Sequence, residues 1–248
     1  MLSSLASLLD SFRIPNRRHR GFNIFSRRRR RQTSSLRCQG IPGVSLQETL
    51  AHEPLEQRRL LAADVNLDGT VLTVAFDDAG TDFVSISMNA TGYQTTGANV
   101  SSGTGTITKL VVTDAGTTRL SSVEISDASQ QLTGGLSVGQ NVSSVEIAAP
   151  IDTAGGDVAI NSSQLTLSNN VSSGSGSQSY GGNVVLAADV NLTTSTGVGG
   201  DLQVKFQGTV DSDSTPRTLN VKSEAIYFDA DVGSTSPLNE FGGQTASD

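Results

Sequence analysis

The sequence contains one internal repeat that is identical letter for letter. The pentapeptide Ser-Ser-Val-Glu-Ile occupies residues 121–125 and again residues 143–147, an offset of 22 residues. Repetition at periods of roughly 20 to 50 residues is typical of repeat architectures, in which each unit buries its apolar face only against its neighbours. The offset matches one coil of a parallel β-solenoid, so it predicts a rod of stacked coils.

Pairs of adjacent glycines repeat at similar intervals. Four pairs occur, at 134–135, 155–156, 181–182 and 199–200, and they are separated by 21, 26 and 18 residues. In the last three pairs, an Asp or Asn and an alternating apolar strand follow the glycines. Glycine supplies positive φ at a corner, and Asp or Asn tolerates left-handed backbone. We expect these three strands to stack in parallel, with equivalent inward positions at Val158, Val184 and Leu202 and at Ile160, Leu186 and Val204.

Other strands are expected from shorter alternating patterns. They lie at 165–167, 190–192, 219–221 and 226–228. An antiparallel sandwich with glycine-rich turns is the alternative fold, because its short strands also recur every 8–12 residues or so. The 22-residue duplication favours the solenoid.

Charge divides the chain into two unlike parts. Residues 1–63 carry 12 Arg and four acidic residues, a net charge of +8, whereas residues 64–248 carry five basic and 20 acidic residues, a net charge of −15. Arginine-rich runs at 17–20 and 27–31 repel one another and stay solvated. We therefore expect a basic, disordered leader over 1–63, a β-hairpin and strand region over 64–118, and solenoid repeats over 119–248.

The leader does not match the simplest targeting or binding signals. An arginine cluster can contact nucleic-acid phosphates, but the acidic body would repel a polyanion. No apolar stretch of about 7–15 residues follows the arginines, as a secretory signal requires. No segment approaches the roughly 20 apolar residues of a membrane span. The lone Cys38 excludes an intramolecular disulfide.

A more specific pattern closes the leader. Residues 53–65 read Glu-Pro-Leu-Glu-Gln-Arg-Arg-Leu-Leu-Ala-Ala-Asp-Val, and this run resembles the N-terminal LEPR-XLL motif of planctomycete exported proteins. The candidate export motif consists of Leu55, Glu56, Arg58, Arg59, Leu60 and Leu61. Gln57 stands where proline is usual in that family. The resemblance implies export to the cell surface or the extracellular space; the alternative is a short helical linker.

The body resembles the repeats of filamentous-haemagglutinin-type and autotransporter adhesins. The resemblance rests on the Gly-Gly-Asp-Val-x-Ile units and on residues 208–221. It implies a right-handed parallel β-helix and an adhesin-like role. The expected partners are extracellular polysaccharide or cell-surface components, together with the export machinery through the leader. No nucleic-acid partner and no transmembrane segment are expected.

One segment could begin a calcium site. Asp64, Asn66 and Asp68 match the first oxygen-ligand positions of an EF-hand loop, but position 12 is Ala75 instead of a bidentate Glu. The residues between alternate as a strand. A β-hairpin that turns at Gly69 is the favoured interpretation, so calcium is a weak candidate and no cofactor is predicted.

Acidic pairs raise the question of catalysis, because solenoid polysaccharide hydrolases and lyases use aspartates on one coil face. Asp77 and Asp78, with Asp82 nearby, and the pair Asp211 and Asp213 lie in turn-like sequence, where Asp is expected for backbone reasons. Both histidines fall in the leader, so the body lacks an imidazole base. We predict no catalytic residues; the alternative function is a β-helix polysaccharide-active enzyme.

Two further expectations concern the last third of the chain. Tyr180 falls in an expected loop over 174–182, where an exposed ring could contact carbohydrate. Residues 242–248 carry no polar capping element and read as the start of another coil, which predicts that the chain is a piece of a longer array.

Overall fold

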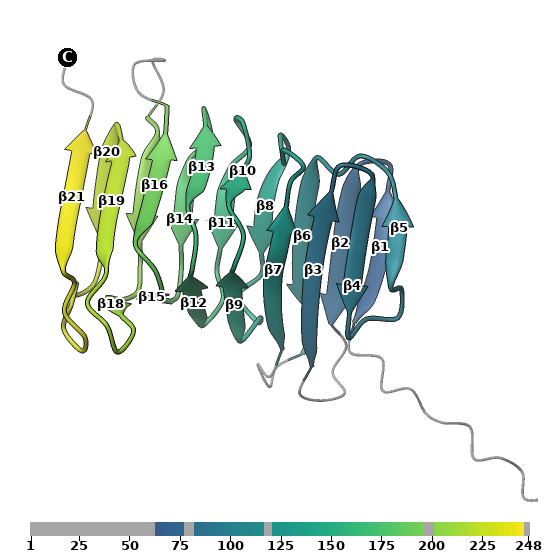
Figure 1. Ribbon diagram of the computed structural model, residues 1–248, viewed down its shortest axis with the longest axis horizontal. Helices are drawn as coiled ribbons and strands as arrows, with labels where there is room; N and C mark the ends of the chain where they lie inside the picture. The colour runs from purple at the N-terminus through teal and green to yellow at the C-terminus, as the bar shows by residue number, and fades with distance from the viewer. Residues whose placement is uncertain (1–62, 77–81, 117–120, 196–200, 246–248) are drawn as a thin grey trace, which may run out of the picture. The chain divides into compact units, whose positions relative to one another are not determined.

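The computed structural model describes residues 63–76, 82–116, 121–195 and 201–245, all within one compact unit that spans 54–248. These residues form strands joined by turns, with no helix among them (Figure 1). The described part of the chain therefore contains no helix that could cross a membrane. The predicted disordered leader and the candidate export motif at 55–61 lie outside the described residues.

Three sheets form the walls of the solenoid, and neighbours in the following orders are hydrogen-bonded. Sheet A contains β1 (Asp64–Asp68), β2 (Val71–Phe76), β6 (Lys109–Asp114), β8 (Gly135–Val138), β11 (Val158–Ile160), β14 (Gln178–Tyr180), β17 (Gln203–Phe206) and β20 (Ala225–Phe228). Sheet B contains β18 (Val210–Ser212), β15 (Asn183–Leu186), β12 (Gln164–Leu167), β9 (Ser144–Ile147), β7 (Ser122–Ala128), β3 (Phe83–Asn89), β4 (Gly92–Thr96) and β5 (Ser102–Thr104). Sheet C contains β10 (Ile151–Asp152), β13 (Val171–Gly174), β16 (Val190–Thr194), β19 (Thr218–Ser223) and β21 (Glu240–Thr245).

Parallel pairing joins each coil to the next. Six successive parallel pairings run along sheet A from β2 to β20, so the chain makes about six turns. The later coils pass from sheet A to sheet B to sheet C before returning to sheet A. This arrangement confirms the predicted parallel β-solenoid and excludes the antiparallel sandwich. The four strands expected from short alternating patterns are present in β12, β16, β19 and β20.

The duplicated pentapeptide marks two coils that lie next to each other. Strands β7 and β9 pair in register, with Val123 opposite Val145 and Ile125 opposite Ile147. All four side chains are buried in the core. The offset of 22 residues in the sequence is therefore the length of one coil.

The glycine-pair strands stack in parallel, but their predicted register is wrong. Val158 lies in sheet A, where its column continues through Gln178 to Val204. Val184 lies in sheet B, in the column of Leu165. The equivalence expected between Ile160 and Leu186 fails for the same reason.

The cause of this error is that glycine pairs occupy two different corners. The pair at 155–156 lies between sheets C and A, and the pair at 181–182 lies between sheets A and B. Coils approach closely at the first corner: a Cβ on Gly156 would collide with the backbone of Gly135, and one on Gly176 with the backbone of Gly156. Both corners exclude side chains, so local sequence does not tell them apart.

The core consists mainly of Val, Leu and Ile, as the composition predicts. Each inward position of a strand stacks on its equivalents in the coils before and after. Near the C-terminal end the column becomes aromatic, and the ring centroids of Tyr180 and Phe206 are 5.2 Å apart, those of Phe206 and Phe228 4.9 Å. Burying one large apolar side chain contributes roughly 1.5–3 kcal/mol, so the stacked columns stabilise the array.

The two ends of the described solenoid differ. At the N-terminal end, β1 pairs antiparallel with β2, and β4 and β5 extend sheet B antiparallel from β3. Strands β2 and β3 already form the first coil, ahead of the expected boundary at residue 119. At the C-terminal end, Gly242 and Gly243 lie inside β21 in sheet C, rather than at a corner that opens a new coil.

Candidate functional site

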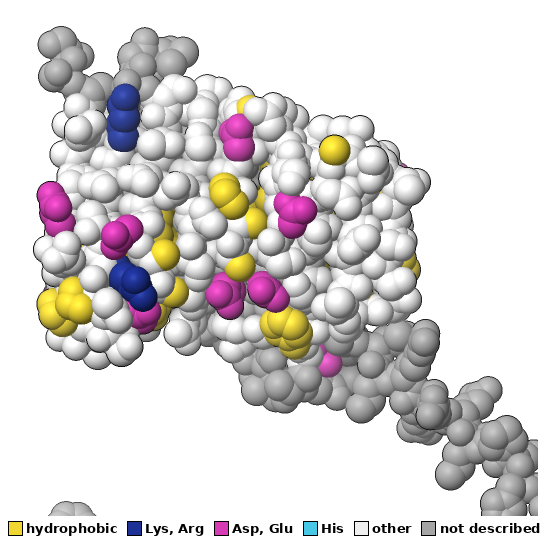
Figure 2. Space-filling view, viewed as in Figure 1, with side chains coloured by type: hydrophobic (Ala, Val, Ile, Leu, Met, Phe, Trp, Pro, Cys, Tyr) yellow, Lys and Arg dark blue, Asp and Glu magenta, His cyan; other side chains and the backbone are white. Residues whose placement is uncertain are grey.

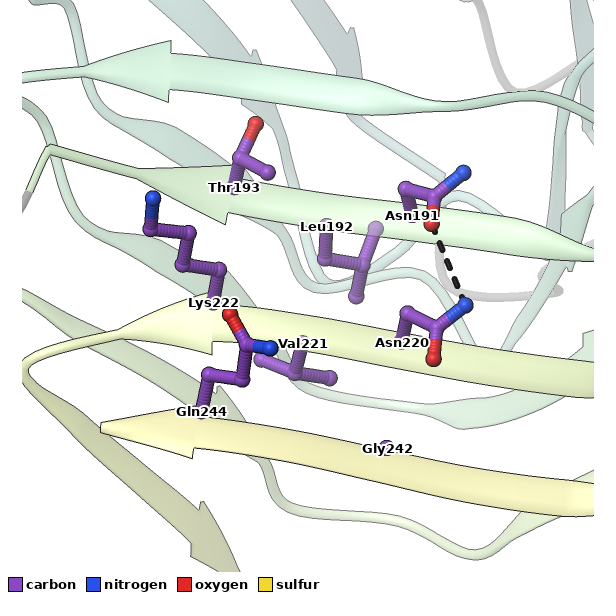
Figure 3. A pocket seen from close by; sticks show the side chains of 8 residues that line it. All are labelled: Asn191, Leu192, Thr193, Asn220, Val221, Lys222, Gly242 and Gln244. Carbon is purple, nitrogen blue, oxygen red and sulfur yellow. Dashed lines mark hydrogen bonds between the residues drawn. The ribbon is translucent and has the colours of Figure 1, made fainter.

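A groove of about 280 Å³ crosses the outer face of sheet C where β16, β19 and β21 run side by side (Figure 3). Its floor is the backbone around Leu192 and Val221, whose side chains are buried on the core side. Outward side chains form two rows along the direction in which coils stack. The first row contains Asn191, Asn220 and Gly242, and the second contains Thr193, Lys222 and Gln244.

The first row is a ladder of side-chain amides. Asn220 Nδ2 donates to Asn191 Oδ1 at 3.2 Å, as the dashed line in Figure 3 shows. Asn191 Nδ2 donates in turn to Asn170 Oδ1 at 3.2 Å, and the Asn191 backbone N–H donates to the same oxygen at 2.8 Å. Each amide is oriented by the coil before it, so the row presents a fixed set of donors and acceptors. Gly242 ends the ladder, because a Cβ there would collide with Asn220 Oδ1.

Lys222 supplies the positive charge of the groove. Two other cations are paired: Lys205 Nζ lies 2.9 Å from Asp229, and Arg217 Nη2 lies 2.8 Å from Asp213. Within the described residues no carboxylate forms an ion pair with Lys222. On the face in Figure 2, acidic side chains are scattered among mainly uncharged ones. The groove thus combines an available ammonium with amides and a hydroxyl, a set that can bind carboxylate and hydroxyl groups.

Asp211, one of the acids considered for catalysis, holds a loop in place. Its Oδ1 accepts hydrogen bonds from the backbone N–H groups of Thr235 at 2.8 Å and Ser236 at 3.1 Å. Burial alone would raise the pKa of Asp211, but these two donors and the Thr209 side chain together hold the pKa below its usual value. The carboxylate therefore fastens the loop at 229–239 to β18 beside a second hollow of about 400 Å³.

Asp213 is also engaged. Arg217 donates to both of its carboxylate oxygens, from Nε at 3.1 Å and from Nη2 at 2.8 Å. The Arg217 side chain and the backbone N–H of Thr215 hold the pKa of Asp213 below its usual value. Both acids at this place thus act as structural acceptors. Asp77 and Asp78 lie outside the described residues.

The predicted hairpin at Gly69 is confirmed. Strands β1 and β2 pair antiparallel, and Gly69 adopts a positive φ of 59° in the turn. Asp64, Asn66 and Asp68 alternate on the exposed side of β1. Successive members of such a row are about 7 Å apart, and Asp64 Oδ1 accepts a hydrogen bond of 2.7 Å from Asn99. Among the described residues no three His, Cys, Asp or Glu side chains are grouped as metal ligands.

The expected exposure of Tyr180 is wrong. The residue lies in β14 and is 0% exposed. Its hydroxyl donates to Gln178 Oε1 at 2.8 Å, and Gln178 Nε2 donates to the backbone oxygen of Thr193 at 2.9 Å. A strand with glutamine at an inward position looks like a loop in sequence, because the core of this coil contains a polar network.

Sequence reasoning also missed the amide ladder. Asn170 lies immediately before β13, and Asn191 and Asn220 lie within β16 and β19. Each asparagine is next to an apolar inward residue, and this shared pattern was the available signal. Comparison of the chain with known protein families, curated proteins and solved structures finds no match.

Proposed function

We propose that this chain is an exported, non-enzymatic structural protein of the cell surface or extracellular space, with an adhesin-like role. The observation that carries the proposal is the groove on sheet C, whose two polar rows follow the stacking direction of the coils. Such a surface suits a linear ligand, because strands spaced about 4.8 Å apart offer the same kinds of group repeatedly. Support for export comes from the resemblance of residues 53–65 to the LEPR-XLL motif.

The chemistry of the groove favours an acidic polysaccharide. Amide and hydroxyl groups of Asn191, Asn220 and Thr193 can exchange hydrogen bonds with sugar hydroxyls. The Lys222 ammonium can pair with a uronate carboxylate. A shallow groove with one cation predicts modest affinity per site, which several molecules on one surface would increase through multivalency.

The alternative, a β-helix polysaccharide hydrolase or lyase, requires free carboxylates. Asp211 is engaged by backbone N–H groups and Asp213 by Arg217. The non-enzymatic function is therefore preferred. Incubation with uronate polymers should release no new reducing or unsaturated ends; release that is abolished in Asp211→Asn or Asp213→Asn would contradict it.

Binding can be tested by titrating the protein with polygalacturonate and with a neutral glucan. We expect Lys222→Gln to lower affinity for the uronate polymer at least tenfold. Lys109→Gln is the matched control, because Lys109 lies on sheet A away from the groove. Equal losses in both variants would indicate diffuse charge attraction and would contradict a site on sheet C.

Export can be tested by fractionating cells that produce the tagged full chain. We expect the protein in the surface or medium fraction, and we expect replacement of Arg58, Leu60 and Leu61 by alanine to retain it in the cell. Finding the unaltered chain in the cytoplasm with its leader intact would contradict export.

A further inference from the structure

The last strand of sheet C has one free edge within the described residues. Strand β21 pairs in parallel with β19 over six residues, and β19 is the only described strand next to it in the sheet. An exposed edge strand is a template for pairing with another chain. We propose that two copies of this chain associate end to end through antiparallel pairing of their β21 strands.

The hydrogen-bonding direction of β21 identifies the groups available to a partner. The Asn239 N–H donates to the Arg217 carbonyl on the β19 side at 2.8 Å. Backbone polar groups of successive residues in a parallel pair point alternately toward and away from the neighbouring strand. The N–H and C=O groups of Glu240, Gly242 and Gln244 therefore point to the free edge.

A two-fold axis at Gly242 places these free groups opposite one another. Gly242 then faces Gly242 of the second copy, and Glu240 faces Gln244 at both ends of the pair. In an antiparallel ladder each such hydrogen-bonded pair exchanges both backbone bonds. On the outer face, the Glu240 carboxylate can accept a hydrogen bond from the Gln244 amide of the other copy, and the two Glu240 side chains stay apart.

The inner face is complementary in the same register. Phe241 becomes the neighbour of Gly243 in the second copy, so the aromatic ring meets a position without a side chain. Phe241 is 44% exposed in the single chain, although its ring contacts Phe228 edge to face at 5.3 Å between centroids. Cross-strand pairing of an aromatic ring with glycine would bury this exposed surface.

The opposite end of the solenoid cannot receive β21 in the same way. Strands β1 and β5 run antiparallel to the coils and complete sheets A and B there. A two-fold contact uses the same surface on both copies and closes after one pairing. The expected product is therefore a dimer rather than a filament, with the grooves on sheet C of both copies meeting at the axis.

The test is sedimentation velocity on the full chain over a range of concentrations. We expect a monomer–dimer equilibrium, which Gln244→Pro weakens at least tenfold because it removes a free-edge N–H and no bond to β19. Circular dichroism and thermal melting check that the variant folds. A chain that is monomeric at every concentration, or one that forms species larger than a dimer, overturns the proposal.

A second variant keeps the test decisive if the proline disturbs the strand. Gln244→Glu places a carboxylate beside Lys222 of its own chain, which favours the fold, but opposite Glu240 of the other copy, which opposes pairing. We expect at least tenfold weaker association at low salt and partial recovery at high salt. Gln203→Glu, on β17 away from the free edge, is the matched control. A dimer that is unaffected by Gln244→Glu would overturn the assignment to β21.

Discussion

The Tyr180 hydroxyl donates a hydrogen bond of 2.8 Å to Gln178 Oε1 inside the solenoid, and both side chains are fully buried. Burial raises the pKa of Tyr180, so the phenol remains protonated and continues to donate. The bond matters for stability because a buried acceptor without a partner is costly. The core of this coil is thus held by polar as well as apolar contacts.

We expect Tyr180→Phe to lower the free energy of unfolding by about 1–3 kcal/mol, because it leaves Gln178 Oε1 without this donor. Equilibrium unfolding in urea measures the loss. The control is Tyr227→Phe, in which the hydroxyl is removed from a ring that is 50% exposed, and little change is expected. Equal effects in both variants would contradict a role for the buried bond.

Replacing a glycine at the tight corner should destabilise the solenoid. A Cβ at Gly156 collides with the backbone of Gly135, whereas one at Gly139 meets only ordinary contacts, the nearest at 3.6 Å. We expect Gly156→Ala to cost about 1–3 kcal/mol, as overpacking does, and Gly139→Ala to stay within about 0.5 kcal/mol of the parent. Thermal melting compares the two; a tolerated Gly156→Ala would refute the close approach of these coils.

Acid should loosen the loop at 229–239. The pKa of Asp211 is lowered in the folded protein, so its ionised form contributes stability above the unfolded-state pKa of about 3.9, and this contribution is lost as pH falls through the folded-state value. We expect Asp211→Asn to lower stability by roughly 1–3 kcal/mol at neutral pH. The loss should shrink below about pH 4. Hydrogen exchange at Thr235 and Ser236 over pH 2–7 reports the change, and an unchanged pH profile in the variant would count against this role.

Calcium should not bind at β1 with sub-millimolar affinity. Asp64, Asn66 and Asp68 lie along an extended strand, so their oxygens cannot converge on one ion that needs six to eight ligands at about 2.3–2.6 Å. Isothermal titration at moderate salt should detect no stoichiometric site. A micromolar site that is lost in Asp64→Ala would overturn the expectation and would make calcium part of the proposed adhesion.

The repeat length and the fold class were predictable because each depends on local chemistry that repeats. Val123 and Val145 stack because the same five residues recur after one coil. The register of the glycine-pair strands was not predictable, because Gly155-Gly156 and Gly181-Gly182 meet similar backbone demands at different corners. A solenoid with three walls offers more than one such corner in each coil, and sequence alone does not label them.

Of the candidate sites, the hairpin at Gly69 followed from turn chemistry, but the groove on sheet C did not. The ladder of Asn170, Asn191 and Asn220 forms only when residues 21 and 29 positions apart are brought together by coils of unequal length. Tyr180 was misplaced because Gln178 interrupts the apolar pattern of its strand. In both cases the deciding contacts join different coils.

The antiparallel strands at the N-terminal end give folding a direction. Once β1 completes sheet A and β4 and β5 extend sheet B, new coils can be added only on the opposite side, in the order in which a ribosome or a translocation pore releases the chain. Each finished coil then presents a ready edge to the residues that emerge next. Synthesis and folding can therefore proceed from the same end, and the first hairpin acts as the template from which the array grows.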